Sequence, residues 1–321
     1  MNKQKITRQT GMTLIETMVA MTISTFLIAG SIGIYIQTRS SYKTADSVAR
    51  MQETANFALD TLEEDIRLAG FWGPTANRLG VTPDPGIGFN CGPDNYVVPG
   101  GTLVAIEAWD EETGNFPCAD RTAPRGDSDV LVLRHVGLTI GEAADAGRIQ
   151  FASDDTGGKL FQNGQSAPYL AANIRNVVVN TYYVSDFTAF DADLPSLRRL
   201  SLDVNGNLRD EEVIPGVENF QVQFGINDLG GNTVDRYVDP EHPAITPATR
   251  ILSARIWLLI RSEVDETTQG FEDDDVYFTP DANMPTLIPG GDFYPPAYRR
   301  LAVLKTIPLK NNLKTDSDPE T

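Results

Sequence analysis

Cysteine and histidine, which supply many metal ligands and nucleophiles, are scarce in this chain: its 321 residues include two of each. His135 and His242 lie far apart in the sequence, and neither has a cysteine or another histidine nearby. A metal or general-base role is therefore not indicated for either. The chain also has no G-x-S-x-G, P-loop or Rossmann fingerprint. These absences predict that the protein is not an enzyme and that it needs no cofactor.

Basic residues are also in the minority, with 26 lysines and arginines against 44 aspartates and glutamates and a net charge of −18. Such a chain repels phosphate backbones unless its basic residues gather in a patch. The sequence shows no such patch. Direct binding of nucleic acid is therefore not expected.

Charge is absent altogether between Thr17 and Thr38, a segment of 22 residues that follows the short basic stretch MNKQKITRQTG at residues 1–11. As a helix with a rise of about 1.5 Å per residue, the segment would be about 33 Å long, enough to cross the hydrocarbon core of a membrane. The basic stretch fits the cytoplasmic side. No Ala-x-Ala-like cleavage site follows Gln37, so we expect processing before the apolar segment rather than after it.

The junction between these segments, GMTLIE at residues 11–16, resembles the prepilin peptidase recognition sequence of type IV pilins and type II secretion pseudopilins. The resemblance implies cleavage after Gly11 and methylation of the new N-terminal residue, Met12. The chain departs from the family at Met12, where phenylalanine is commoner.

Glu16 is an acid at the head of an apolar helix. A carboxylate costs about 2.5 to 3.5 kcal/mol at mid-bilayer unless something pairs with it. The resemblance implies that Glu16 attracts the free α-amine of Met12 on a neighbouring subunit and so sets the register of assembly. The alternative is that Glu16 merely lies at the membrane interface, near the head groups.

The helix is expected to continue well beyond the apolar segment. No proline occurs between Met12 and Trp72. Apolar residues recur at helical spacing after residue 45, at Val48, Met51, Ala55, Ala58, Leu62 and Ile66. Gly70 is suited to end the helix, with Pro74 just beyond. The second half of this helix should pack on a domain.

The remainder of the chain is rich in turns and in short strand-like runs. Before Asp129 the sequence is punctuated by proline and glycine and predicts long loops with a strand at residues 102–108. Further strands are predicted at residues 130–136, 177–184, 197–202, 217–226, 251–261 and 300–307. These runs and the long helix predict an antiparallel sheet and an α+β fold. The resemblance at residues 11–16 implies that this fold is type IV pilin-like, with the long helix packed on a β-rich domain.

Three expectations concern the inside and outside of this sheet. Phe220, Val222 and Phe224 alternate with glutamines, which predicts one buried face and one wet face. The apolar run at residues 256–260 predicts a central strand covered on both faces, one of them by the N-terminal helix. The acidic, proline-rich stretch between residues 263 and 296 predicts a solvated surface loop.

Cys91 and Cys118 form an isolated pair in a chain that carries the marks of export, which favours a disulfide over a metal site. Two thiolates alone cannot complete a zinc shell. Two free thiols are the alternative. The expected organisation is a leader at 1–11, a long helix at 12–70 (transmembrane over 12–37, amphipathic over 38–70), a disulfide-stapled loop-rich region at 71–128 and a β-rich periplasmic domain at 129–321.

Two acidic segments raise the possibility of calcium binding, because each gathers oxygen ligands around glycine turns. One contains Asp228, Asn232, Asp235 and Asp239, and the other runs from Asp203 to Asp210. Neither has the spacing of an EF-hand. The alternative is that the Asn-Gly and Gly-Gly pairs simply make hairpin turns.

A second resemblance covers the C-terminal half. The segments IPGVENFQVQFG (214–225), DRYVD (235–239), RIWLLIRS (255–262) and RRLAVLKTIPLKN (299–311) look like the C-terminal half of PilW-type minor pilins. This resemblance implies a minor pilin that helps to initiate type IV pilus assembly in a priming or tip complex. Its partners would be other minor pilins, the major pilin, prepilin peptidase and a PilY-type tip adhesin. Twitching motility, adhesion and DNA uptake would depend on it indirectly.

The expected location is the inner membrane, with a single span and a periplasmic domain, and afterwards the pilus on the cell surface. A type II secretion minor pseudopilin is one alternative, because it shares Gly11 and Glu16. A pilus-tip adhesin that binds through loops at residues 71–128 and 263–298 is another, and a membrane-anchored enzyme is a third.

Overall fold

The computed structural model describes residues 11–73, 104–110, 124–140, 148–154, 157–161, 173–203, 208–229, 231–246, 249–267, 270–291 and 293–312, and the backbone of residues 81–82, 90–91 and 94–95. The chain divides into two compact units, Met1–Ala49 and Arg50–Thr321. The first contains most of one long helix. The second contains the end of that helix and the strands.

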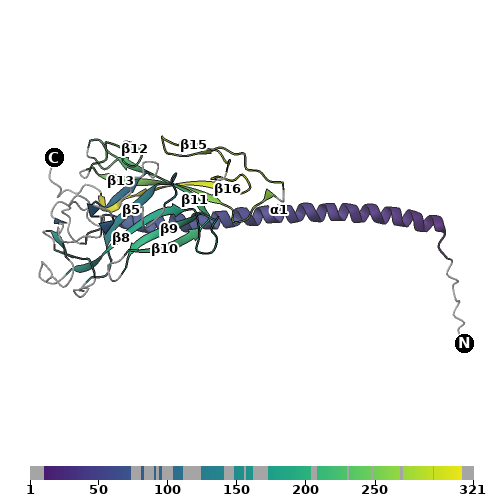
Figure 1. Cartoon of the computed structure of the whole chain (residues 1–321), viewed down its shortest axis with the longest axis horizontal. Coiled ribbons are helices and arrows are strands. Elements are labelled where there is room, and N and C mark those ends of the chain that lie inside the picture. Colours follow the sequence, from purple (N-terminus) through teal and green to yellow (C-terminus); the bar gives the residue numbers. More distant parts are fainter. Residues whose placement is uncertain are drawn as a thin grey trace, which may run out of the picture. The chain divides into compact units, whose positions relative to one another are not determined.

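The long helix, α1, runs without a break from Leu14 to Leu68 (Figure 1). The prediction of its extent is confirmed to within a residue or two at each end. It ends because Gly70 adopts a positive φ of 77°, a backbone conformation that glycine takes at little steric cost. The amide of Gly70 then donates to the carbonyl of Arg134 at 3.0 Å, which fixes the end of the helix to a strand.

The strands are β1 (Val81–Thr82), β2 (Asn90–Cys91), β3 (Asp94–Asn95), β4 (Ile106–Trp109), β5 (Val130–Val136), β6 (Gln150–Ser153), β7 (Gly158–Phe161), β8 (Ile174–Ser185), β9 (Ser196–Leu202), β10 (Leu208–Pro215), β11 (Val217–Ile226), β12 (Arg236–Val238), β13 (Ile251–Arg261), β14 (Tyr277–Phe278), β15 (Thr286–Leu287) and β16 (Arg300–Pro308), followed by a 3₁₀ turn, η5 (Lys310–Asn312). Each strand expected from the sequence is present. The strands β6, β7, β10, β12, β14 and β15 were not anticipated.

The first sheet has the strand order β1-β7-β6-β8-β5-β4, with β9 beside β8 and β10 beside β9. Its pairs are antiparallel except for β1 and β7. β8 organises the sheet because it is twelve residues long and serves several partners. It pairs with β5 on one edge, and with β6 and then β9 along the other. β4 pairs with β5, so the described parts of residues 71–128 and 129–321 share one sheet.

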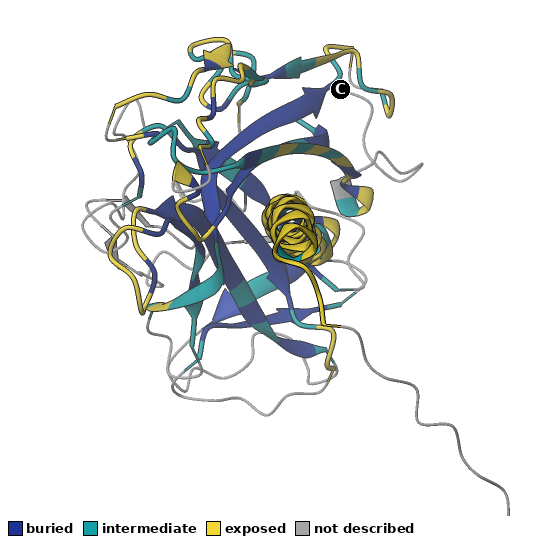
Figure 2. Ribbon diagram, turned by 90° about the vertical axis from the view of Figure 1, so that its right-hand side faces the viewer, coloured by how far each residue is buried: buried dark blue, intermediate teal, exposed yellow. Residues whose placement is uncertain are grey.

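The second sheet has the order β12-β11-β13-β16 and is antiparallel throughout. β13 lies between two partners, and all of its residues except the half-buried Arg255 are buried. The expectation that the run at 256–260 forms a central strand is therefore confirmed. In Figure 2 the strands of both sheets are largely dark blue, the colour of buried residues.

The expected wet face of β11 is wrong, because the strand is buried along its whole length. Gln221 donates to the carbonyl of Asp127 at 2.8 Å, and Gln223 donates to Asp239 at 2.7 Å and to the carbonyl of Pro280 at 2.8 Å. Buried amides that find partners cost little. The polar and apolar alternation was real, but it could not show that other segments would cover the polar face.

The expected solvated loop at residues 263–296 is also corrected. Part of this segment packs on the outer face of the second sheet, where Leu287 and Tyr294 are buried with Trp257 and Leu259 of β13. Phe278 remains 74% exposed. The segment is therefore a cover with one buried and one exposed side rather than a free loop.

A buried ion-pair network fixes this cover to the sheet. Glu218 of β11 accepts two hydrogen bonds from Arg300 of β16, of 2.5 and 3.0 Å. The guanidinium of Arg261 lies 3.7 Å from the same carboxylate. A third hydrogen bond, of 2.9 Å, joins Arg300 to Asp273 in the cover. The side chains of Arg300 and Glu218 have no exposed area. Buried charges of this kind are tolerated only when each finds a partner.

The second half of α1 contacts both sheets. Its buried residues are Met51, Ala55, Ala58, Leu59, Leu62 and Ile66. On the first sheet, Asp65 accepts hydrogen bonds from the Tyr182 hydroxyl at 2.5 Å and the Asn180 amide at 2.6 Å. On the second, Lys305 lies 2.5 Å from Glu63. The predicted packing of this half of the helix on a domain is confirmed.

One buried acid joins the two sheets. The amide of Asp129, directly before β5, donates to the carbonyl of Phe220 at 2.8 Å, and the Asp129 side chain accepts from the amide of Val222 at 2.7 Å. Burial raises the pKa of Asp129 well above its ordinary value, and repulsion from Asp110 and Asp281 adds to the effect. The carboxyl group of Asp129 therefore holds its proton more strongly in the folded chain than in the unfolded chain.

We predict that Glu218→Gln lowers the free energy of unfolding by about 3 kcal/mol, because it removes the carboxylate that makes two of the hydrogen bonds to the buried Arg300 and leaves Asp273 as its one acidic partner in the network. Denaturant unfolding of the full chain in detergent measures this loss. The control is Glu211→Gln, which breaks the partly exposed ion pair with Arg199 and should cost less than about 1 kcal/mol. Equal losses in the two variants would contradict the prediction.

We predict a second effect, on the pH dependence of stability. The stabilisation from a raised pKa is complete below the pKa of an unfolded aspartate, about 4, and is lost as the pH rises through the folded pKa. The melting temperature should therefore fall as the pH is raised from about 4. Asp129→Asn should flatten this slope, whereas substitution of the exposed Asp274 by asparagine should leave it unchanged. An unchanged slope in Asp129→Asn would exclude this residue as the source.

Candidate functional site

The segment around Gly11 and Glu16 is the part of the chain to which the sequence assigns a function. Gly11, Met12 and Thr13 precede the helix, and all three are exposed. α1 begins at Leu14. The bond between Gly11 and Met12 is therefore in a non-helical, accessible stretch, as a peptidase requires. Residues 1–10 lie outside the described part of the chain.

Glu16 folds back on the start of its own helix. Its Oε2 accepts hydrogen bonds from the amide and the hydroxyl of Thr13, both at 2.9 Å, and the amide of Glu16 donates to the Thr13 hydroxyl at 3.4 Å. Thr13 is thus the N-cap and Glu16 the third helical residue of a capping box. The negative charge lies at the positive end of the helix dipole, where it is favoured. The carboxylate is satisfied locally within a single chain.

Thr13 is a functional residue that the sequence analysis overlooked. The signature Thr-x-x-Glu before an apolar run is the recognised pattern of a capping box, and it is present at residues 13–16. From the sequence, Glu16 was expected either to pair with an α-amine of another subunit or to lie at the membrane interface, and neither expectation included its contact with Thr13.

Four hydroxyl groups of the apolar segment bind carbonyls of the same helix. Thr22, Thr25 and Ser31 each donate to the carbonyl four residues earlier at 2.8 Å, and Thr17 donates to the carbonyl of Leu14 at 2.8 Å. Polar groups in a lipid environment must find such partners. Among the described helices, α1 is the one long and apolar enough to cross a membrane, by length and composition.

The large side chains of this segment point outward. Leu14, Ile23, Phe26, Leu27 and Ile34 are each more than half exposed on the isolated helix. Such a helix needs lipid or other apolar helices around it.

The predicted disulfide cannot be placed. Cys118 lies outside the described residues, and of Cys91 only the backbone, in β2, is described. The disulfide stays a prediction.

The calcium candidates lie in the connection between β11 and β12. Asp228 is bound by Arg236 through two hydrogen bonds of 3.0 Å, and Asp235 accepts from the amide of Asp228 at 3.2 Å. Asp239 binds Gln223 instead, and Asn232 is at the exposed surface of the turn. In the part of the chain that the structure describes, no group of three or more His, Cys, Asp or Glu side chains could hold a metal ion. Calcium binding stays a prediction.

The second calcium candidate also joins two strands. Residues 204–207 lie outside the described part, but β9 and β10 on either side pair as an antiparallel hairpin. Asp210 is bound there by Arg198 at 2.6 Å. Both candidate segments therefore connect neighbouring strands, as the alternative of hairpin turns expects.

The two histidines make local hydrogen bonds. His135, buried in β5, has its Nδ1 3.0 Å from the carbonyl of Val136, and a carbonyl can only accept, so Nδ1 donates. Nδ1 of His242 accepts from the amide of Ala244 at 3.1 Å.

Comparison with known families identifies two regions of the chain. Residues 181–311 match the family described as type IV pilus-assembly protein W, and residues 6–32 match the prokaryotic N-terminal methylation motif. The first region runs from the middle of β8 to η5 and contains the second sheet. The second contains Gly11, Met12 and Glu16. The two resemblances drawn from the sequence are therefore confirmed.

Among solved structures, a type IV-like pilin, TTHA1219 from Thermus thermophilus, is similar at 12% sequence identity and a TM-score of 0.41. The match covers 83% of this chain and 100% of the other. A search of curated proteins found no matching sequence.

We predict that Thr13→Val loosens the first turn of α1 by about 1 kcal/mol, because it removes a capping hydroxyl. Hydrogen exchange at the amides of residues 14–17, in the uncleaved chain in micelles, should become faster. Thr22→Val is the matched control, since its hydroxyl binds a carbonyl within the helix and not the helix start. Faster exchange in both variants, or in neither, would contradict the capping role.

Proposed function

We propose that this chain, a type IV pilus-related pilin with a prepilin motif and a PilW region, is a minor pilin that helps to initiate pilus assembly. It would act in a priming or tip complex with other minor pilins, the major pilin and a PilY-type adhesin. Prepilin peptidase would cleave it after Gly11. The observation that carries the proposal is an acid, Glu16, held at the head of an apolar helix directly after the cleavage site.

Cleavage changes the charge balance at this point. Hydrolysis of the bond between Gly11 and Met12 removes Lys3, Lys5 and Arg8 and exposes an α-amine on Met12. A cation then stands beside a segment whose only acid is Glu16. Opposite charges attract strongly where water is excluded. An amine on one subunit and Glu16 on the next can therefore select a single axial register.

We expect Glu16 to have different partners before and after assembly. In the single chain, Thr13 satisfies the carboxylate. A carboxylate has room for further donors, so a neighbouring amine can join or replace these contacts when the subunit enters the filament. The capping box thus lowers the cost of the acid before assembly without blocking the later pairing.

The prepilin motif and the apolar start of α1 fit a membrane-anchored pilin. Before assembly, the chain would cross the inner membrane once, with Arg50–Thr321 in the periplasm. Afterwards it would belong to the pilus at the cell surface, with effects on twitching and adhesion through assembly. The PilW region supports this role over that of a type II secretion pseudopilin, with which the N-terminal motif is shared.

The test uses a deletion strain that carries the wild-type chain, Glu16→Ala or Glu53→Ala. We predict that the wild-type chain begins at Met12 and is methylated on its α-amine, as intact mass spectrometry would show. Glu16→Ala should be cleaved equally but restore few or no surface pili, because the amine has no partner. Glu53→Ala removes an exposed acid of α1 beyond the apolar segment and should restore pili fully.

Other results would point elsewhere. A retained leader in cells with active peptidase, or normal piliation by Glu16→Ala, would contradict the proposal. Deletion that blocks exoprotein release but spares pili would identify a pseudopilin. Pili that form normally without the chain but fail to adhere would identify an adhesin.

A further inference from the structure

The outer side of the cover, residues 263–296, displays large apolar side chains. Phe278 is 74% exposed, Ile288 is 62% exposed and Val276 is 45% exposed. All three lie in or directly beside the hairpin of β14 and β15. Single apolar residues are common on protein surfaces, so the decisive question is whether these three lie together.

The register of this hairpin determines which side chains share a face. Tyr277 pairs with Leu287, and Phe278 pairs with Thr286. Consecutive residues of a strand point to opposite faces. Tyr277 and Leu287 pack with Trp257 of β13, so their face is the inner one. The face that carries Phe278 is therefore the outer one.

The outer face is a continuous apolar patch. By the same register Val276 lies opposite Ile288, and both stand on the face of Phe278. Side chains that are opposite or diagonal to each other in an antiparallel pair come into contact. Val276, Phe278 and Ile288 therefore form one patch, which we call the outer patch. Contiguous exposed apolar residues mark interaction surfaces, whereas isolated ones do not.

Acidic side chains border the outer patch on the N-terminal side of β14. Glu272, Asp274 and Asp275 are exposed. Within the residues that the structure describes, no basic side chain binds any of these three carboxylates. Asp273 points inward instead and binds Arg300 at 2.9 Å. The border therefore presents three negative charges to a molecule that approaches the outer patch.

The hairpin is held in position from its inner side. The hydroxyl of Tyr277 lies 3.1 Å from both carboxylate oxygens of Asp273, and the amide of Asp273 donates to the carbonyl of Pro296 at 2.8 Å. Beyond β14, Gln223 donates to the carbonyl of Pro280 at 2.8 Å. A surface that is already ordered loses little conformational entropy when it binds. The cover thus presents the outer patch as a preformed surface.

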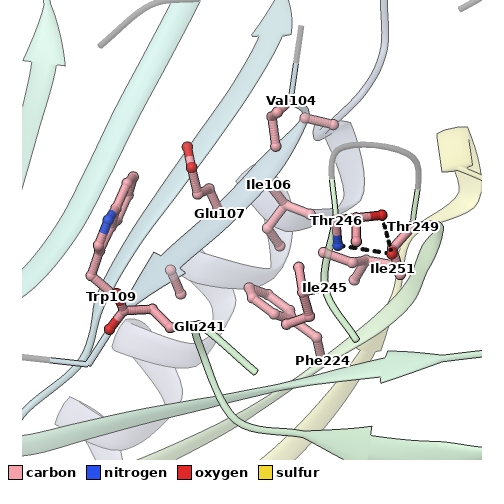
Figure 3. A pocket seen from close by; sticks show the side chains of 12 residues that line it. Val104, Ile106, Glu107, Trp109, Phe224, Glu241, Ile245, Thr246, Thr249 and Ile251 are labelled. Atoms are coloured by element: carbon pink, nitrogen blue, oxygen red, sulfur yellow. Dashed lines mark hydrogen bonds between the residues drawn. The ribbon is translucent and has the colours of Figure 1, made fainter. Parts of the chain in front are cut away.

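A cavity beside β4 offers much less room than this face. Its volume is about 280 Å³, and Phe224 and Ile251 line it. Figure 3 shows Ile106 turned toward these side chains, and a hydrogen bond of 2.9 Å from the amide of Thr246 to the hydroxyl of Thr249 holds part of the wall. A specific protein interface buries about 800 Å² on each partner. The outer patch and its border suit such a partner better than the cavity does.

The charge of the border indicates which kind of molecule binds. Three carboxylates repel anionic lipid head groups and nucleic acid. A second copy of this chain has a net charge of −18 and is also repelled. A protein surface with lysine or arginine beside apolar side chains is attracted to the border and can cover the patch. The complementary partner is therefore a different protein with a basic and apolar surface.

We propose that the outer patch and its acidic border are a docking surface for another subunit of the pilus, one with an apolar surface flanked by lysine or arginine. Phe278 would be the central contact, because it is the largest and most exposed of the three apolar residues. The basic side chains would lie opposite Glu272 and Asp274. The proposal rests on the proposed function only in taking the partner to be a pilus subunit.

The test places a photoreactive benzoylphenylalanine at Thr286 of the full chain in piliated cells. Thr286 is exposed and pairs with Phe278 in the hairpin, so the probe lies on the outer face. Illumination and mass spectrometry then identify the crosslinked peptide. We expect a peptide of another pilus subunit in which lysine or arginine lies near apolar residues.

Phe278→Ser tests the apolar contact. It should reduce the crosslink about tenfold, because the burial of this side chain against the partner is lost. The matched control is Leu229→Ser, which removes an apolar side chain that is 93% exposed in the connection between β11 and β12. The control should leave the crosslink unchanged. Both variants should keep the melting temperature of the wild-type chain, since each side chain is mostly exposed.

Asp274→Lys tests the charge of the border. A positive charge at this position repels a basic partner and should reduce the crosslink about fivefold. Asp193→Lys is the matched control, because it makes the same change of net charge at an exposed acid in the connection between β8 and β9. This control should leave the crosslink unchanged.

The outcomes are distinct. Loss of the crosslink in Phe278→Ser and Asp274→Lys, but in neither control, at similar melting temperatures, supports the proposal. An undiminished crosslink in Phe278→Ser overturns it, as do equal losses in the controls. A crosslink only to lipid, to a second copy or to a protein outside the pilus also overturns it, and so does the absence of any crosslink. None of these failures affects the processing and piliation test based on Glu16.

Discussion

The structure of this chain depends on one constraint: a carboxylate placed among apolar groups must have donors. Glu16 meets the constraint in the single chain by folding back on Thr13 at the start of α1. The contact is local and weak enough to be exchanged, because a capping interaction contributes only about 1 kcal/mol. Under the proposed function, the α-amine of a neighbouring subunit would offer a full positive charge in its place. The same acid would then be stable in a monomer and selective in an assembly.

The same constraint shapes the interior of the larger unit. Asp65 fixes α1 to β8 through Tyr182, and Glu218 fixes β11 to β16 through Arg300. Asp129 joins the two sheets through the amide of Val222. Asp65 and Asp129 each bind groups from a different layer, whereas Glu218 binds Arg300 within its own sheet and Arg300 in turn binds Asp273 of the cover. Because removal of one partner leaves a buried charge or polar group unpaired, such contacts tie the layers into one cooperative unit.

The two sheets differ in how their surfaces are covered. The outer face of the second sheet is closed by Leu287 and Tyr294, which pack on Trp257. The edge of the first sheet at β4 is bordered by a cavity instead. The cover that closes the second sheet in turn exposes Val276, Phe278 and Ile288 on its own outer side.

The sequence by itself determined the elements that depend on neighbouring residues: the uninterrupted α1, its end at Gly70, the apolar segment with Glu16 at its head, and the long strands β5, β11 and β13. Helical spacing, the absence of proline and runs of branched residues are local signals, so they can be read from the chain. Tertiary structure alone decided that the glutamines of β11 are buried, that the acidic segment at 263–296 covers a sheet, and that β4 borders a cavity. These features depend on which distant segments come into contact. The identity of a polar residue does not show whether its hydrogen-bond partner will be water or another side chain.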